Sequence, residues 1–291
     1  TFFASKATRG RVDKIKAKDR PEIFQHPDFS GQLYKLVDMV LDVPSVISAL
    51  ANNVNQGDSP KTFLTPASQQ QWQITDGQAS LLITANDQVI EVKAKQFIFT
   101  AGKGNGEILK QLNAQQPQMQ TRPLQQVMIK HDYPHPFYGH CLGADKTPRL
   151  TISSHKATDG KWIWYLGGSL AEKGVSQTAD ELINCAKKEL TSLMPWVDLT
   201  NAKWSTLAVD RAEPKQKNLV RPDQAFIGSL NNIANAAVAW PTKLTLAPNL
   251  ANEVLQLLQN KNISPSSSKE VHSLDTLLPI APLSDSPWDF M

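Results

Sequence analysis

The feature that most constrains the fold is an apolar run near the C-terminus that passes through a short turn into a helical pattern. The run occupies residues 232–240, the turn is Pro241-Thr-Lys-Leu-Thr245, and apolar side chains recur at helical spacing over residues 248–258. We predict a buried strand, a tight turn and a helix. A helix start presents unpaired backbone N–H groups and the positive end of the helix dipole, and Lys243 would add a full charge. The segment therefore predicts a site for an electron-rich ligand.

A second strand-to-helix turn lies in the first half of the chain. The apolar run of residues 96–101 enters Gly102-Lys-Gly-Asn-Gly106 and then a helical pattern that continues to about Leu112. A continuous apolar run of this kind predicts a strand buried on both faces, as in a parallel sheet. The third glycine comes one residue too early for the dinucleotide motif G-x-G-x-x-G. The turn is therefore open to three interpretations: a plain glycine turn, an NAD site, or the far end of a dinucleotide-binding sheet that begins elsewhere.

Composition excludes several classes of protein. Of the 291 residues 41% are hydrophobic and 20% charged, which is typical of a folded globular chain of one large domain or two intertwined ones. The net charge is only +3 with both signs interspersed, so we expect no binding to nucleic acid. No apolar run reaches about 18 residues, and the first residues show no charged segment followed by an apolar core, so we expect neither a membrane span nor a signal peptide. Two cysteines form no disulfide framework, so we expect a cytoplasmic protein.

The remaining pattern predicts a mixture of helices and strands. A strand over residues 31–38 precedes a helix over residues 44–54, and short alternating runs to residue 100 predict a small antiparallel sheet with a turn at Asp76-Gly77. We further predict strands near residues 124–130, 149–154, 162–167 and 204–210, an amphipathic helix over residues 178–193, and an extended or loosely ordered tail over residues 262–291.

Several segments together resemble one flavoprotein family. The chain resembles D-amino-acid oxidase and FAD-dependent glycerol-3-phosphate dehydrogenase over roughly residues 30–260. The segments that carry the resemblance are Lys95–Gly102, Asp42-Val-Pro44 with its helix, Trp204–Pro214 followed by Arg221-Pro-Asp223 and Phe226-Ile-Gly228, and Pro241–Thr245, which stands where the dehydrogenases have G-G-K-L-T-T.

The resemblance implies FAD as cofactor and a mixed α/β fold, in which a partial Rossmann-like FAD-binding domain is interleaved with a mixed-sheet substrate-binding domain. It assigns residues 1–55 to a substrate-domain strand and crossing helix, 56–118 and 216–261 to the FAD-binding domain, 119–215 to the substrate-binding domain, and 262–291 to the tail. The family's N-terminal G-x-G-x-x-G and its ribose-binding acid are absent from the sequence. Because the chain also begins at Thr1 rather than Met, we expect an N-terminally truncated chain.

The implied activity is oxidation of a small anionic amine or alcohol, such as an amino acid, a 2-hydroxy acid or a glycerol-3-phosphate-like compound, by hydride transfer to flavin N5. Arg211 is the candidate anchor for the substrate anion, because a guanidinium pairs with a carboxylate or phosphate through two parallel hydrogen bonds. An ion pair with Asp210 or Glu213 is the structural alternative. The candidate cofactor-binding residues are those of the two turns: Thr100, Ala101, Gly102, Pro241, Thr242, Lys243, Leu244 and Thr245.

A histidine-rich stretch over residues 130–141 is the other chemical cluster. Its prolines and the lack of a second ligand pair argue against a zinc site, so we expect no metal. Tyr138 and His140 are candidates for handling the proton of the substrate, whereas we interpret His131 and His135 as structural. Two alternatives to the flavin enzyme remain at this point: a non-catalytic remnant of the same fold, and an NAD enzyme that uses Gly102–Gly106.

Overall fold

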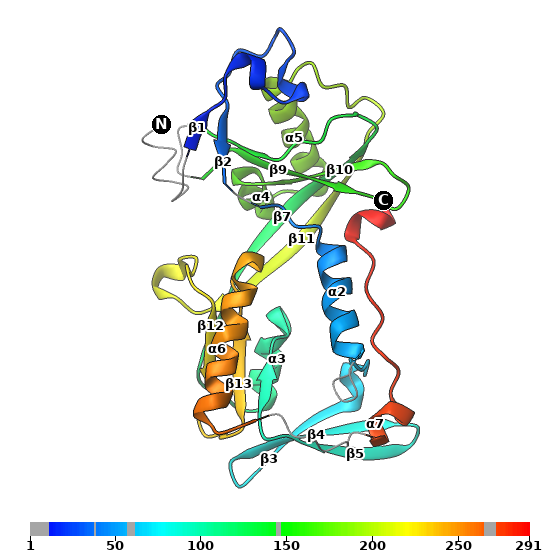
Figure 1. The fold of residues 1–291 in the computed structure, drawn as a ribbon, viewed down its shortest axis with the longest axis vertical. Helices are drawn as coiled ribbons and strands as arrows, with labels where there is room; N and C mark the ends of the chain where they lie inside the picture. Colours follow the sequence, from blue (N-terminus) through cyan, green and yellow to red (C-terminus); the bar gives the residue numbers. More distant parts are fainter. Residues whose placement is uncertain (1–11, 38, 57–61, 144–146, 265–271) are drawn as a thin grey trace. The chain divides into compact units, whose positions relative to one another are not determined.

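The computed structural model describes residues 12–37, 39–56, 62–143, 147–264 and 272–291, and they form a mixed α/β structure of two compact units (Figure 1). Unit 1 comprises residues 1–47, 123–209 and 284–291, and unit 2 comprises residues 48–122 and 210–283. Two long strands, β7 (Met119–His131) and β11 (Lys203–Pro214), supply residues to both units. The helix α2 (Val43–Asn55) also crosses a boundary, and it has no buried residue.

Unit 1 is built on a five-stranded sheet in the order β11-β7-β10-β9-β8. Its inner strand β10 (Trp162–Gly167) pairs antiparallel with β7 and with β9 (Leu150–Lys156), and the short edge strand β8 (Gly139–Cys141) pairs with β9. A separate two-stranded ladder joins β1 (Val12–Lys14) and β2 (Tyr34–Leu36). The short helix α4 (Ser169–Lys173) follows β10 directly.

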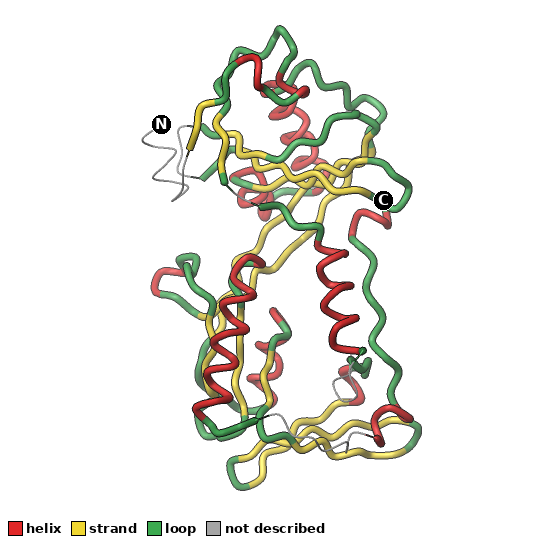
Figure 2. The backbone as a smooth tube through the Cα atoms, viewed as in Figure 1, coloured by secondary structure: helices red, strands yellow, loops and turns green. Residues whose placement is uncertain are grey.

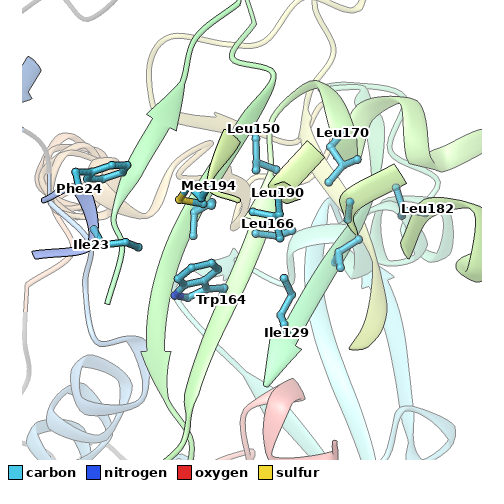
Figure 3. Close-up of a cluster of buried hydrophobic side chains, with 13 residues drawn as sticks. Ile23, Phe24, Ile129, Leu150, Trp164, Leu166, Leu170, Leu182, Leu190 and Met194 are labelled. Carbon is cyan, nitrogen blue, oxygen red and sulfur yellow. The ribbon is translucent and has the colours of Figure 1, made fainter. Parts of the chain in front are cut away.

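The core of unit 1 includes side chains of the sheet and one face of α5 (Ala179–Leu193) (Figure 3). Leu182, Ala186 and Leu190 recur at helical spacing and are buried, and they belong to the same cluster as Ile129 and Trp164 of the sheet. The helix begins at a capping box: the Thr178 hydroxyl accepts a hydrogen bond from the Glu181 N–H at 3.3 Å, and the Glu181 carboxylate accepts from the Thr178 N–H at 2.9 Å.

Unit 2 contains a three-stranded sheet in the order β12-β13-β6. The fully buried strand β13 (Ala236–Trp240) lies in the middle, antiparallel to β12 (Phe226–Ser229) and parallel to β6 (Phe97–Phe99). The helix α3 (Asn105–Gln111) follows β6, and α6 (Ala247–Asn260) follows β13 and lies along β12 and β13 (Figure 2). The core between the sheet and the α3 segment includes Phe99, Leu109, Leu112, Val238 and Trp240.

A second sheet of unit 2 is an antiparallel meander of β3 (Gln70–Thr75), β4 (Gln78–Ala85) and β5 (Gln88–Lys93). Its first hairpin turns at Asp76 and Gly77, with φ of 50° and 71°. Two positive φ values at the central positions match the twist of the flanking strands, which explains the Asp-Gly pair in the sequence. The helix α7 (His272–Leu277) packs Leu274 against the buried Ile83 of this sheet.

Most of the expected elements are confirmed, and two expectations are wrong. Among the described residues β6 is an edge strand in which only Phe99 is buried, so the expectation of burial on both faces is wrong there. The expected buried strand near the C-terminus is confirmed as β13, which begins at Ala236. The tail is not merely extended: it contains α7 and a short 3₁₀ helix, Pro287–Phe290, whose Trp288 is buried in unit 1 and stacks on His155. Residues 265–271 of the expected tail lie outside the described residues. In the part of the chain that the structure describes, no helix is long and apolar enough to cross a membrane.

Candidate functional site

The structure brings the two predicted cofactor-binding turns to one edge of the β12-β13-β6 sheet. β6 and β13 run parallel, with Phe97 opposite Ala236 and Phe99 opposite Val238, so their carboxyl ends lie at the same edge. Thr100, Ala101 and Gly102 follow β6 there, and Pro241–Thr245 follow β13. The end of β13 contacts the first turn directly, because the Trp240 indole Nε1–H donates to the Gly102 carbonyl at 3.1 Å. Ligands of open α/β sheets bind outside the carboxyl ends of the strands.

Asn105 holds the first turn against the end of β13, and no sequence pattern predicts this role. Its side chain is fully buried. The Oδ1 atom accepts the Ala101 N–H at 2.9 Å, and Nδ2 donates to the Ala239 carbonyl at 3.2 Å. One amide therefore bridges the end of β6 and the end of β13. The only local signal is an asparagine at the start of a helix, flanked by two glycines, whereas its partner in β13 is 134 residues away.

The first turn leaves open space beside Gly102. This residue has a φ of +56°, is exposed, and has no heavy atom within 4 Å of the position that a Cβ would occupy. The adjoining Thr100 and Ala101 are also exposed. A backbone of this kind allows a ligand to approach closely, which is one use of glycine at a positive φ.

The second turn presents backbone donors. After Thr242, whose φ is 61°, Leu244–Leu246 form a 3₁₀ turn that continues into α6. The first hydrogen bond of that turn runs from the Leu246 N–H to the Lys243 carbonyl at 3.0 Å, so the N–H groups of Leu244 and Thr245 have no partner within the helix. Leu244 and Thr245 are exposed, and Lys243 is half-buried. These donors and the Lys243 charge suit the electron-rich O2 end of a flavin, so the residues present fit the cofactor that the resemblance implies.

The three glycines of Gly102–Gly106 serve different purposes. Gly104 and Gly106 are helical, because a 3₁₀ turn over Gly102–Gly104 leads directly into α3. A Cβ at Gly106 would lie 2.7 Å from the Met119 Cε, so this glycine makes room for packing. Only Gly102 has a positive φ and open space, which favours the interpretation of the turn as one end of a larger site over a self-contained NAD cradle.

Arg211, the candidate substrate anchor, lies on β11 in unit 2 beside a buried ion pair. Its Nε–H donates to the Arg122 carbonyl at 3.2 Å. The carboxylate of Glu213, which is 2% exposed, accepts the Arg122 Nε–H at 2.8 Å and the Nη2–H at 2.7 Å. Asp210 pairs with Lys103. Both carboxylates proposed as partners of Arg211 thus have another cation as ion-pair partner.

The charge of Arg211 nevertheless acts on Glu213. Burial alone would raise the pKa of the Glu213 carboxyl, but hydrogen bonds from Arg122 and Gln120 and the charges of Arg122 and Arg211 outweigh it and lower the pKa. Glu213 is therefore ionised near neutral pH. The group of Arg122, Arg211 and Glu213 combines two guanidinium groups with one carboxylate.

The other two predicted catalytic residues belong to unit 1. Tyr138 precedes the edge strand β8 and is 50% exposed, and His140 lies on that strand opposite Thr151 and is exposed. Partial burial raises the pKa of the Tyr138 phenol, so this group is protonated at neutral pH. The structure thus gives Arg211 to one unit and Tyr138 and His140 to the other.

The remaining histidines of the stretch have structural contacts, as expected. His131 is buried, its Nδ1 accepts the Tyr133 N–H at 3.1 Å, and burial lowers its pKa from 6.5 to about 4. His135 Nδ1 lies 2.8 Å from the Glu22 carboxylate. Among the described residues, no group of three or more His, Cys, Asp or Glu side chains is placed to hold a metal ion.

Comparison with known proteins identifies the family. No family model matches the chain. The "Probable FAD-dependent oxidoreductase PA4991" of Pseudomonas aeruginosa is 40% identical over 292 residues, which cover 99% of this chain and 70% of the relative. The crystal structure of the FAD-dependent oxidoreductase PA4991 from the same organism matches with a TM-score of 0.82 and 36% identity, over 98% of this chain and 76% of that one. Iminodiacetate oxidase (IdaA) from Chelativorans sp. BNC1 matches with a TM-score of 0.42 and 18% identity, over 74% and 53% of the two chains. The chain belongs to the family of FAD-dependent oxidoreductases that includes PA4991.

Proposed function

We propose that this chain supplies the turns after β6 and β13 to an FAD site, and that the enzyme oxidises a small anionic amine or alcohol. The first part rests on one observation. Both turns follow the carboxyl ends of the parallel strands β6 and β13, and hydrogen bonds of Trp240 and Asn105 hold the ends of these strands together. FAD, when bound, supplies the acceptor for the substrate hydride at flavin N5.

In this proposal the turn after β13 would hold the electron-rich O2 end of the flavin. The N–H groups of Leu244 and Thr245 would donate hydrogen bonds to it, and Lys243 would add a positive charge. Donors and a cation at this place would favour negative charge on the ring. The exposed backbone of Thr100, Ala101 and Gly102 forms the adjoining wall, where the open space at Gly102 admits the cofactor.

Arg211 is the proposed anchor for the substrate anion. Its Nε–H donates to the Arg122 carbonyl on the neighbouring strand β7, and the planar guanidinium has the geometry for bidentate binding of a carboxylate or phosphate. A bidentate contact to a carboxylate or phosphate orients the reacting C–H bond and selects for anionic substrates.

The cofactor part is tested with Lys243→Ala. Loss of one charge-assisted contact, about 1.5–3 kcal/mol, should weaken FAD binding roughly tenfold or more, measured by titrating apoprotein with FAD and following the flavin fluorescence. Lys110→Ala is the matched control, since Lys110 is an exposed lysine on α3 in the same unit. Equal FAD affinity for wild type and Lys243→Ala would refute this role.

The substrate part is tested with matched pairs of compounds. Glycerol-3-phosphate is compared with glycerol, and an amino acid with its amide, so that each pair differs mainly in the anion. The enzyme should prefer the anionic member of the pair that it oxidises, and Arg211→Ala should raise its KM about tenfold without loss of flavin. Lys203→Ala, on the same strand, is the control. An unchanged preference in Arg211→Ala would reject the anchoring role and leave the cofactor proposal standing.

A further inference from the structure

Thr242, in the turn after β13, has a backbone conformation that is costly for its type of side chain. Its φ is 61°, which lies in the left-handed region. Glycine enters this region freely and asparagine and aspartate tolerate it, whereas a β-branched side chain is strained there. In the part of the chain that the structure describes, Thr242 is the only β-branched residue with a positive φ. Such a conformation persists where surrounding contacts hold it, and it is concentrated at functional sites.

The backbone hydrogen bond across Thr242 shows what this conformation achieves. The Lys243 N–H donates to the Pro241 carbonyl at 2.7 Å, so the bond spans a single residue. With the positive φ of Thr242 at its centre, this three-residue reversal is the rare, strained form of γ-turn. Lys243 itself is extended, with φ −146° and ψ 145°, and the 3₁₀ turn Leu244–Leu246 follows it directly. The γ-turn therefore sets the direction in which Lys243 and the N–H groups of the 3₁₀ turn leave β13.

A side-chain hydrogen bond of Thr242 holds this γ-turn. The Thr242 Oγ1–H donates to the Gln224 carbonyl at 3.0 Å. Gln224 lies two residues before β12, and β12 pairs antiparallel with β13, with Phe226 opposite Trp240. The bond therefore joins the turn that follows β13 to the segment that leads into the neighbouring strand.

We propose that Thr242 is a positioning residue of the flavin site, whose hydroxyl pins the γ-turn and so keeps Lys243 and the N–H groups of Leu244 and Thr245 in place for the cofactor. This role rests on the proposed function of the turn after β13. A site whose donors are already in place binds its ligand more tightly, because binding does not have to order the loop. Without the hydroxyl bond, a β-branched residue would relax towards a negative φ and move the donors.

Three replacements of Thr242 separate this pinning from a general contribution to the fold. Thr242→Val keeps the shape of the side chain without the hydroxyl, and we expect it to bind FAD about fivefold more weakly than wild type in titrations of the apoprotein. This factor corresponds to about 1 kcal/mol for one hydrogen bond. Thr242→Ser keeps the hydroxyl and Thr242→Gly has no strain to release, so both should bind FAD more tightly than Thr242→Val. A residue that merely supported the fold would make glycine the weakest of the three.

Unfolding in urea measures the strain without FAD. Glycine ordinarily destabilises a folded chain relative to valine, because it loses more backbone freedom on folding. At position 242 the order should be reversed, so Thr242→Gly should unfold at a higher urea concentration than Thr242→Val. Thr84 is the matched control, since it is exposed on β4 in the same unit and has no positive φ. There the valine variant should be the more stable one, and it should bind FAD as the wild type does.

Three results would overturn the proposal: wild-type FAD affinity in Thr242→Val, FAD binding by Thr242→Gly that is as weak as that of Thr242→Val, or the ordinary order of stability at position 242. Lys243→Ala distinguishes the two roles of the turn. If it weakens FAD binding and Thr242→Val does not, the turn meets the flavin without help from Thr242. If neither variant changes FAD binding, the turn does not meet the flavin.

Discussion

Asn105→Ala tests the mechanism that joins the two proposed flavin-binding turns. Asn105 is buried and makes one hydrogen bond to the turn after β6, at 2.9 Å to the Ala101 N–H, and one to the end of β13, at 3.2 Å to the Ala239 carbonyl. Ala239 is 1% exposed, so its carbonyl cannot turn to water when the amide is removed. An unsatisfied buried carbonyl costs about 1–3 kcal/mol, and the lost bond to the more exposed Ala101 adds about 1 kcal/mol. We therefore expect the free energy of unfolding to fall by about 3 kcal/mol.

Urea denaturation of wild type and variant, followed by tryptophan fluorescence, measures this change. The matched control is Asn252→Ala, because Asn252 is exposed on α6 in the same unit and its replacement should change stability by less than about 0.5 kcal/mol. The same two variants are then titrated with FAD at a temperature where both are folded. Asn105→Ala should bind FAD at least tenfold more weakly, because the turns are no longer held in contact.

Asn105→Asp adds a pH test. The carboxylate can still accept the Ala101 N–H, but it places a buried negative charge against the Ala239 carbonyl, and burial raises the pKa of such a carboxyl. The protonated form can donate to that carbonyl, so this variant should lose less stability at acidic pH than at pH 8. If Asn105→Ala unfolds at the same urea concentration as the wild type, Asn105 does not hold the first turn against the end of β13.

Two further predictions concern titrating groups. Glu213→Gln breaks the buried pair with Arg122 and should cost about 3 kcal/mol of unfolding free energy at neutral pH. Because the folded-state pKa of Glu213 is lowered, the stability that its carboxylate contributes is present above the unfolded-state pKa and is lost on acidification. The difference in unfolding free energy between wild type and Glu213→Gln, measured in urea, should therefore shrink as the pH falls. A difference that stays constant with pH would contradict the lowered pKa of Glu213. The pKa of His131 is lowered from 6.5 to about 4, so the folded state favours the neutral ring and wild-type stability should decline from pH 6.5 towards pH 4. His131→Phe should flatten that decline in thermal melts, and an unaltered slope would show that another group causes it.

Local patterns were sufficient to predict most of the secondary structure. The helix α5 shows its apolar face and its capping residues within one stretch of sequence, and the Asp76-Gly77 turn requires no distant contact. The strands β1, β8 and β12 have only three or four residues, too few for a periodicity to emerge, and they were not predicted. Trp288 was not expected to be buried because its own segment is rich in Ser and Pro, and its partner His155 is distant in sequence.

The site could be predicted only in part, because some of its contacts join residues that are distant in the sequence. The turns after β6 and β13 were found because a strand, a turn and a helix start are adjacent in the chain. The residues that hold the turns together act across long separations: Asn105 reaches Ala239 over 134 residues, and Trp240 reaches Gly102 over 138. Likewise, Glu213 was considered as a partner of Arg211, whereas its bidentate ion pair is made with Arg122, 91 residues away. Such pairings are decided by the fold rather than by local sequence.

The visible absorption spectrum of the purified protein, recorded before and after a candidate substrate is added without oxygen, tests the flavin site and the substrate class together. We expect the absorption bands of bound flavin, which should bleach with a small anionic amine or alcohol and bleach much less with its uncharged analogue. A correctly folded protein that stays colourless after incubation with FAD would refute the proposed flavin site.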